Sequence, residues 1–188
     1  MGNSIAHVAA RAGYQVLLFD VQQEALKQGL ATLSKNMDRE VAKNKLTISE
    51  KSEAISRITL TTDITRLAES HFIIEAVIED FAVKTKVLQS LDTTVRPGVI
   101  LASNTSSLSI TKMASKTLRP DKIIGMHFMN PVPVMNLVEI VRGLATSDVA
   151  APCERDNMDA RWFAGVLRSG KTWPPKAAAM PPNPRLRA

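Results

Sequence analysis

The chain has 188 residues, of which 45% are hydrophobic and 22% charged, proportions typical of a soluble globular protein rather than of a disordered one. It contains no run of 18 apolar residues and does not begin with the charged and apolar regions of a signal peptide. The single cysteine, Cys153, excludes an internal disulfide and agrees with a reducing compartment. The sequence therefore predicts a cytoplasmic protein without a membrane partner.

The net charge of +6 is concentrated near the C-terminal end. Residues 149–188 hold seven basic and three acidic residues, which leaves a net charge of only +2 for residues 1–148. The main part of the chain offers no broad basic surface, so we expect no nucleic-acid partner.

Residues 1–148 alternate between helix-like and strand-like segments. Small residues over 4–12 predict a helix that stops at Gly13, and an apolar stripe predicts a second helix over 22–43. Strands are expected at 15–19, 57–62, 72–77, 99–103 and 123–128, a further helix from the end of 72–77 to about residue 94, and a short one at 110–114. This alternation predicts an α/β domain of the Rossmann type, doubly wound around a largely parallel sheet.

The N-terminal residues fit the middle of a dinucleotide-binding motif. Such a motif has a strand, a Gly-x-Gly-x-x-Gly turn, a helix and an acidic residue about twenty positions later. Gly2 stands where the third glycine would be, and Asp20 ends the next expected strand. We therefore expect NAD as cofactor, with Asp20 accepting hydrogen bonds from the adenosine ribose; the alternative is that Asp20 only caps the following helix. The motif's first strand is absent, so the expected sheet lacks an interior strand.

Polar side chains come at or just after the ends of several expected strands: Asp20, Glu79, Asn104, Ser106 and His127. Ligands of open parallel sheets bind beyond the carboxyl ends of the strands. His127 is followed by Asn130 and, twelve residues on, by Glu139. A histidine, a carboxylate and an amide at such an edge are components of an acid/base site.

Three blocks carry a family resemblance: residues 103–108, Ser-Asn-Thr-Ser-Ser-Leu; residues 127–135, His-Phe-Met-Asn-Pro-Val-Pro-Val-Met; and residues 137–139, Leu-Val-Glu. A fourth segment, residues 75–79 with Lys84 after it, is similar to a Val-Glu-Ala-x-x-Glu-x-x-x-x-Lys pattern of the same family. Over residues 1–148 the chain resembles the NAD-binding domain of L-3-hydroxyacyl-CoA dehydrogenases, which include the 3-hydroxybutyryl-CoA dehydrogenases.

The resemblance implies an oxidoreductase of fatty-acid metabolism that converts L-3-hydroxyacyl-CoA to 3-oxoacyl-CoA with NAD. His127 would be the general base for the 3-hydroxyl, and Glu139 would orient and stabilise it. Ser106 would bind the substrate oxygen, and Asn130 would help to position the nicotinamide.

The remaining implied contacts are with the cofactor and with CoA, and no metal is implied. The cofactor contacts would come from Gly2, Asp20, Glu79, Lys84, Asn104, Ser106 and Asn130. A lysine-rich segment, represented by Lys43 and Lys45, would lie near the CoA phosphates.

Several of these residues also have a purely structural interpretation. A histidine at a strand end is often a core or surface group, Glu139 can be an exposed residue of an edge strand, and Ser106 can cap a helix at 107–114. His7 and His71 are expected to be structural or exposed.

Near Val149 the sequence becomes rich in proline, arginine and alanine. Residues 149–188 are expected to form an irregular tail with at most a short helix near 155–167. The family's helical C-terminal domain, which carries the homodimer interface, is expected to be missing, and a frameshift or a misjudged gene boundary would explain this. Three hypotheses follow: a 3-hydroxyacyl-CoA dehydrogenase, an inactive fragment with residual nucleotide or CoA binding, and a scaffold.

Overall fold

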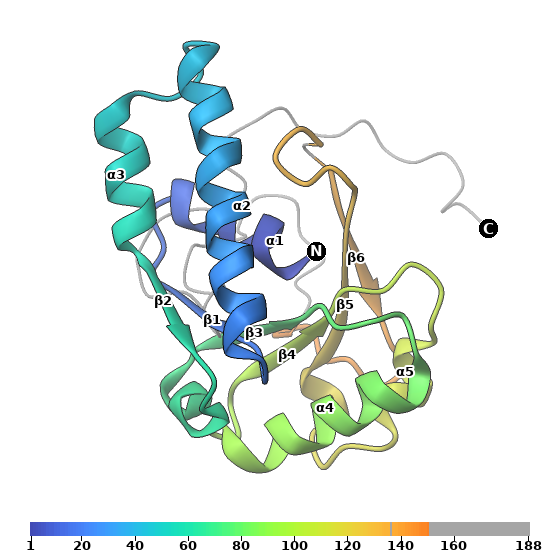
Figure 1. Ribbon diagram of the computed structural model, residues 1–188. Coiled ribbons are helices and arrows are strands. Elements are labelled where there is room, and N and C mark those ends of the chain that lie inside the picture. The colour runs from blue at the N-terminus through green and yellow to red at the C-terminus, as the bar shows by residue number, and fades with distance from the viewer. Residues whose placement is uncertain (136, 151–188) are drawn as a thin grey trace, which may run out of the picture.

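The computed structural model describes residues 1–135 and 137–150, in which helices cover two β-sheets (Figure 1). The elements are α1 (Gly2–Arg11), β1 (Val16–Phe19), α2 (Gln23–Ala42), α3 (Ile48–Ser56), β2 (Ile58–Thr61), the 3₁₀ helix η1 (Ile64–Glu69), β3 (Phe72–Glu75), α4 (Phe81–Thr94), β4 (Ile100–Ser103), α5 (Ile110–Ala114), the 3₁₀ helix η2 (Pro120–Lys122), β5 (Ile123–Phe128) and β6 (Val138–Arg142). The predicted α/β class is confirmed. No helix within these ranges is long and apolar enough to cross a membrane.

Helix α4 begins at Phe81 rather than directly after residue 77, and the other expected elements differ from the observed ones by no more than two residues at either end. The apolar pattern does not predict α3, although its N-terminal signal is present. Thr47 Oγ1 accepts from the Glu50 N–H, and the Glu50 carboxylate accepts from the Thr47 N–H, a capping box. The short helix expected near 155–167 lies outside the described residues.

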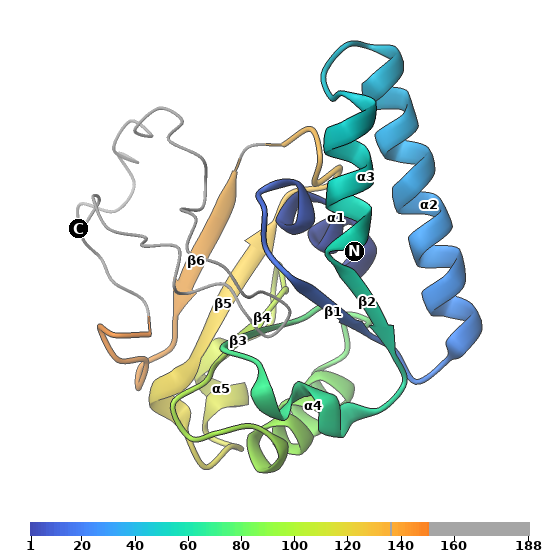
Figure 2. The same ribbon diagram turned by 90° about the vertical axis from the view of Figure 1, so that its left-hand side faces the viewer.

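The strands form a pair, β1–β2, and a four-stranded sheet in the order β3-β4-β5-β6 (Figure 2). All pairings are parallel except that of β5 with β6. In a doubly wound sheet of order 3-2-1-4-5-6, β1 and β3 would flank the first strand. Within the described residues these two strands do not pair with each other. The break in the sheet thus falls where the sequence predicts a missing interior strand.

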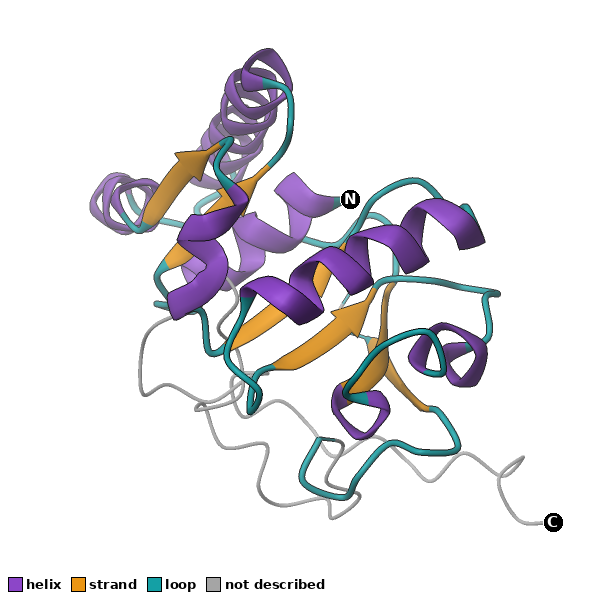
Figure 3. Cartoon of the chain, turned by 90° about the horizontal axis from the view of Figure 1, so that it is seen from below, coloured by secondary structure: helices purple, strands orange, loops and turns teal. Residues whose placement is uncertain are grey.

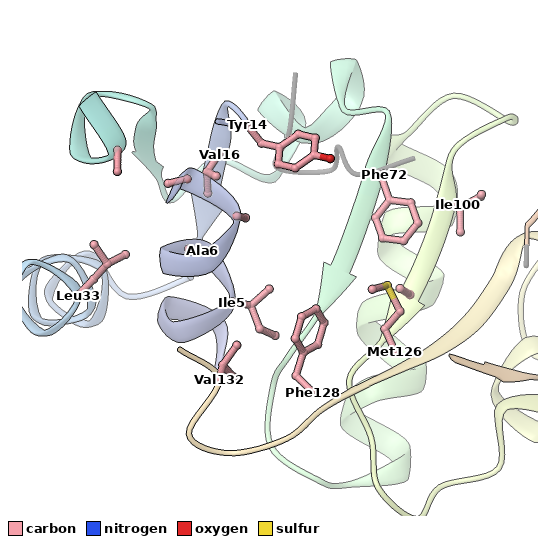
Figure 4. Close-up of a cluster of buried hydrophobic side chains, with 14 of the residues drawn as sticks. Ile5, Ala6, Tyr14, Val16, Leu33, Phe72, Ile100, Met126, Phe128 and Val132 are labelled. Atoms are coloured by element: carbon pink, nitrogen blue, oxygen red, sulfur yellow. The ribbon is translucent and has the colours of Figure 1, made fainter. Parts of the chain in front are cut away.

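Two hydrophobic clusters cover the two faces of the sheets, and strand side chains alternate between them. Ile100 and Met126 belong to the cluster beneath α1 (Figure 4). Leu101 and Ile123 belong to the cluster beneath α4 and α5, the helices that cover the opposite face (Figure 3). Val16 of β1 shares the first cluster with Ile100, so one core continues under both sheets and joins them.

Two features define helix α1: the glycine that follows its C-terminal end and the contact of His7 with α2. Gly13, just beyond the helix, has φ 94°, a left-handed conformation that ends a helix at little cost for glycine. His7 is fully buried, with Nε2 3.5 Å from Glu40 of α2. Burial lowers the pKa of His7 even though Glu40 opposes this. His7 is therefore a structural residue, as predicted, whereas His71 is exposed.

Gly125 allows β6 and α5 to approach β5 closely. A Cβ at this position would lie 2.9 Å from Val141 Cβ and 3.0 Å from Ile110 Cδ1, inside normal carbon–carbon contact. The same register places Val141 opposite Gly125 and Glu139 opposite His127. The glycine thus supports the strand pairing on which the candidate site depends.

We expect Gly125→Ala to lower the free energy of unfolding by about 1–3 kcal/mol, because the added methyl overpacks the junction of β5, β6 and α5. Urea unfolding followed by circular dichroism measures this change. Gly98→Ala is the matched control, since a Cβ there meets nothing within 4 Å. An equal loss in the two variants would contradict the explanation.

Candidate active site

His127 and Glu139 form a hydrogen-bonded pair between β5 and β6. They are direct cross-strand partners, and His127 Nδ1 lies 3.0 Å from Glu139 Oε2. The side chain of His127 is 24% exposed and that of Glu139 is 54% exposed, so a substrate can approach the pair. Because a carboxylate only accepts, Nδ1 carries the hydrogen of the neutral ring and Nε2 keeps a lone pair. Glu139 is thus both an exposed residue on β6 and a partner of His127.

Glu79 holds the loop that follows β4. Its Oε1 accepts from the Thr105 hydroxyl, from the Ser106 N–H at 3.1 Å and from the Ser107 hydroxyl at 3.3 Å. Partial burial alone would raise the pKa of Glu79, but these hydrogen bonds and the Lys84 ammonium outweigh it and lower the pKa. Glu79 is therefore an anion that fixes this loop.

Ser106 is exposed, and no hydrogen bond within the described part of the chain uses its hydroxyl. It does not cap α5, because the N-cap is Ser109, whose side chain accepts from the Lys112 N–H. The capping interpretation of Ser106 is thus not supported, and its hydroxyl is available for a ligand.

Lys84 and Asn104 tie three strand ends together. Lys84 Nζ donates to Glu75 Oε1 and to the Asn104 carbonyl, both at 2.9 Å. Asn104 Oδ1 accepts from the Phe128 N–H at 3.0 Å, next to His127. Lys84 is fully buried, so the prediction that it contacts a cofactor directly does not fit its position. Its ammonium faces protein groups instead.

The start of α1 and the end of β1 carry the remaining predicted cofactor contacts. A Cβ on Gly2 would be 4.0 Å from Ala76 Cβ, which places the start of α1 beside the end of β3. The first turn of α1 has neither an acidic residue nor a side-chain cap, so its N–H groups suit an anion. Asp20 Oδ1 accepts from the Gln22 N–H, and Gln22 rather than Asp20 is the N-cap of α2. These groups fit the pyrophosphate and ribose of a dinucleotide.

Three predicted residues lie apart from this network. Asn130 is exposed in the loop between β5 and β6, and no hydrogen bond connects its side chain to another described residue. Lys43 and Lys45 are exposed at the tip of the α2–α3 hairpin, which projects beyond the sheets (Figure 1). The structure does not bring either lysine to His127.

Glu75 is a residue of this network to which sequence reasoning gives no role. It ends β3, is 4% exposed, and binds Lys84 and the Ser103 hydroxyl. A carboxylate at the end of an apolar strand, nine residues before a lysine, is the signal that could have pointed to it.

Comparison with known proteins finds similar sequences over most of the chain. A family model described as "3-hydroxyacyl-CoA dehydrogenase, NAD binding domain" matches residues 1–155. The 3-hydroxybutyryl-CoA dehydrogenase of Bradyrhizobium diazoefficiens is 46% identical over 156 residues, which cover 83% of this chain and 53% of that protein. The probable 3-hydroxybutyryl-CoA dehydrogenase of Bacillus subtilis is 48% identical over 151 residues, 80% of this chain and 53% of that protein.

The chain is also similar to a solved structure of a 3-hydroxybutyryl-CoA dehydrogenase. The crystal structure of (S)-3-hydroxybutyryl-CoA dehydrogenase PaaH1 from Ralstonia eutropha is 46% identical with a TM-score of 0.79, and the match covers 81% of this chain and 54% of that one. The chain therefore spans about half the length of the curated relatives it matches.

We expect Glu79→Gln to destabilise the protein in a pH-dependent way. The pKa of Glu79 is lowered from 4.5 by folding, so its contribution to stability is present above pH 4.5 and is lost as the pH falls through the lowered value. Urea unfolding at a series of pH values should show the largest difference from wild type near neutral pH and none in strong acid.

Glu24→Gln is the control for this experiment, since its carboxylate is 70% exposed on α2. A difference between Glu79→Gln and wild type that is the same at every pH would contradict the assignment.

Proposed function

Because the chain belongs to the family of 3-hydroxyacyl-CoA dehydrogenase NAD-binding domains, we propose that it catalyses the NAD-dependent conversion of 3-hydroxyacyl-CoA to 3-oxoacyl-CoA. The observation that carries the proposal is the pair of His127 and Glu139, with Nδ1 and Oε2 3.0 Å apart and Nε2 left as a proton acceptor. The pair lies at the edge where a doubly wound sheet binds its ligands.

His127 accepts and returns the proton of the substrate's 3-hydroxyl. Nε2 accepts the proton of the substrate's 3-hydroxyl, and Glu139 stabilises the imidazolium that results. In the reverse direction, Nε2 returns the proton to the oxygen at C3. Ser106 donates its hydroxyl hydrogen to that oxygen and so favours the developing negative charge.

The cofactor would lie along the carboxyl edge. NAD bound there would supply the hydride acceptor for C3 in oxidation, and NADH would supply the hydride in reduction. Asp20 would bind the adenosine ribose and disfavour a 2′-phosphate, and the N-terminus of α1 at Gly2 would face the pyrophosphate. Asn104 and Asn130 would position the nicotinamide half, and Glu79 would order the loop beside it.

The substrate class follows from the relatives, whose names specify 3-hydroxybutyryl-CoA. For this chain we propose the broader class of 3-hydroxyacyl-CoA thioesters. Lys43 and Lys45 are the proposed contacts to the CoA phosphates, because they present two cations at the exposed hairpin tip. A homodimer and a cytoplasmic location remain predictions.

A second candidate is binding of nucleotide or CoA without turnover. The named activities belong to whole proteins of which this chain covers 53%, so binding and turnover are tested separately. In this case the polar edge would still bind NADH, but substrate would not be reduced. A role as scaffold alone would require neither property.

We expect the purified chain to oxidise NADH with acetoacetyl-CoA, and His127→Gln to lower kcat by about 10²–10⁴-fold, because the general base is removed. Glu139→Gln should lower kcat by at least about tenfold, since the imidazolium loses its counter-charge. The decrease in absorbance at about 340 nm, where reduced nicotinamides absorb, follows the reaction.

His71→Gln is the matched control, because this histidine is exposed and outside the site. Turnover that is equal in wild type and His127→Gln would refute the proposed mechanism. NADH binding without turnover would select the second candidate, and the absence of both would leave the scaffold hypothesis.

A further inference from the structure

Glu75 has contacts unlike those of an ordinary strand residue. Its side chain is 1% exposed, and its two oxygens accept three hydrogen bonds. Oε1 accepts from Lys84 Nζ at 2.9 Å and from the Val77 N–H at 2.6 Å, and Oε2 accepts from the Ser103 hydroxyl at 2.5 Å. A buried carboxylate with three donors, one of them a cation, is fully satisfied and therefore held in one orientation.

Lys84 depends on this carboxylate. It is fully buried, and a buried ammonium is costly unless it is paired and hydrogen-bonded. Besides Glu75, Lys84 Nζ donates to the carbonyls of Val77 at 3.3 Å and Asn104 at 2.9 Å. It also lies 3.5 Å from Glu79 Oε2. Glu75 is the closer of its two carboxylate partners and the buried one.

Asn104 connects Glu75 and Lys84 to the end of β5. Its N–H donates to the Glu75 carbonyl at 2.7 Å, and its carbonyl accepts from Lys84. Its side-chain Oδ1 then accepts from the Phe128 N–H, the backbone group that follows His127. The orientation of Asn104 therefore sets where the end of β5 lies.

Glu79 connects Lys84 to the loop after β4. One of its oxygens faces Lys84, and the other accepts from Thr105, Ser106 and Ser107. Lys84 thus contacts both groups that hold the loop: the Asn104 carbonyl and the Glu79 carboxylate. A shift of its ammonium would move Ser106 and the end of β5 relative to each other.

We propose that Glu75 is a positioning residue of the active site, which sets the distance between Ser106 and His127 by fixing Lys84. It touches no reacting atom. The proposal rests on the proposed function, because that function needs Ser106 and His127 to act on one substrate oxygen. A displacement of about 1 Å between such groups is enough to lower a rate by about two orders of magnitude.

The test compares Glu75→Gln with Asp92→Asn in the full chain. Asp92 is also a buried carboxylate of this domain, 5% exposed and paired with Arg119, but it lies eight residues beyond Lys84 on α4, about 12 Å along the helix. Both variants remove one buried negative charge from a cation, which is fully buried in the case of Lys84 and partly buried in the case of Arg119. Only Glu75→Gln does so at the site.

The first readout is the amide spectrum from ¹⁵N-resolved NMR, which needs no turnover. Glu75→Gln should shift the amide signals of Ser106, His127 and Phe128, whereas Asp92→Asn should leave these three signals in place. The double variant Glu75→Gln/Lys84→Met removes both buried charges and so avoids an unpaired ammonium if the single variant fails to fold. It should shift the same three signals, because Lys84→Met removes the ammonium that donates to the Asn104 carbonyl.

The second readout is kinetic. Per folded molecule, Glu75→Gln should lower kcat at least about tenfold and change KM by less than about threefold, as expected for an interaction used in the transition state. Asp92→Asn should lose stability with kcat unchanged. Unshifted Ser106, His127 and Phe128 signals in the folded Glu75 variants would overturn the proposal. Absence of turnover in wild type would count against the proposed function alone, since the NMR comparison still decides the role of Glu75.

Discussion

The candidate site depends on the burial of one positive charge. Lys84 is fully enclosed at the start of α4, and an enclosed ammonium must have its hydrogens satisfied. It finds its acceptors at the ends of β3 and β4, and Asn104 extends the link to β5. Because this ammonium needs hydrogen-bond acceptors, the ends of β3, β4 and β5 are held close together. Ser106 and His127 lie at two of these ends.

A second constraint brings Glu139 to His127. The residues are twelve apart in sequence, and only the antiparallel return of β6 makes them neighbours. Gly125 permits this return because a side chain there would meet Val141 and Ile110. The His127–Glu139 pair is thus a product of backbone register, and the exposed loop between the strands does not have to hold it.

Local sequence patterns predict most of the fold. The apolar runs over 72–77, 99–103 and 123–128 contain the strands β3, β4 and β5, which are apolar because both faces of the sheet are covered. Gly13 ends α1 in the conformation that glycine favours. The sequence pattern predicts which residues lie at strand ends, but it does not predict how deeply each of them is buried. Lys84 belongs to the family-like segment, yet its burial follows from three-dimensional contacts with Glu75 at the end of β3 and Asn104 after β4. The spacing of Glu75 and Lys84 is visible in the sequence, but the contacts that give Glu75 its role appear only in the structure.

The proposed site requires a nicotinamide cofactor to bind along the carboxyl edge beside His127. Titration of the ¹⁵N-labelled chain with NADH measures whether it does. Binding at this edge should produce saturable shifts of the Asp20, Asn104, Ser106 and His127 amide signals and none at the hairpin tip around Lys45. Unchanged signals at the strand ends, or shifts confined to other surfaces, would contradict it.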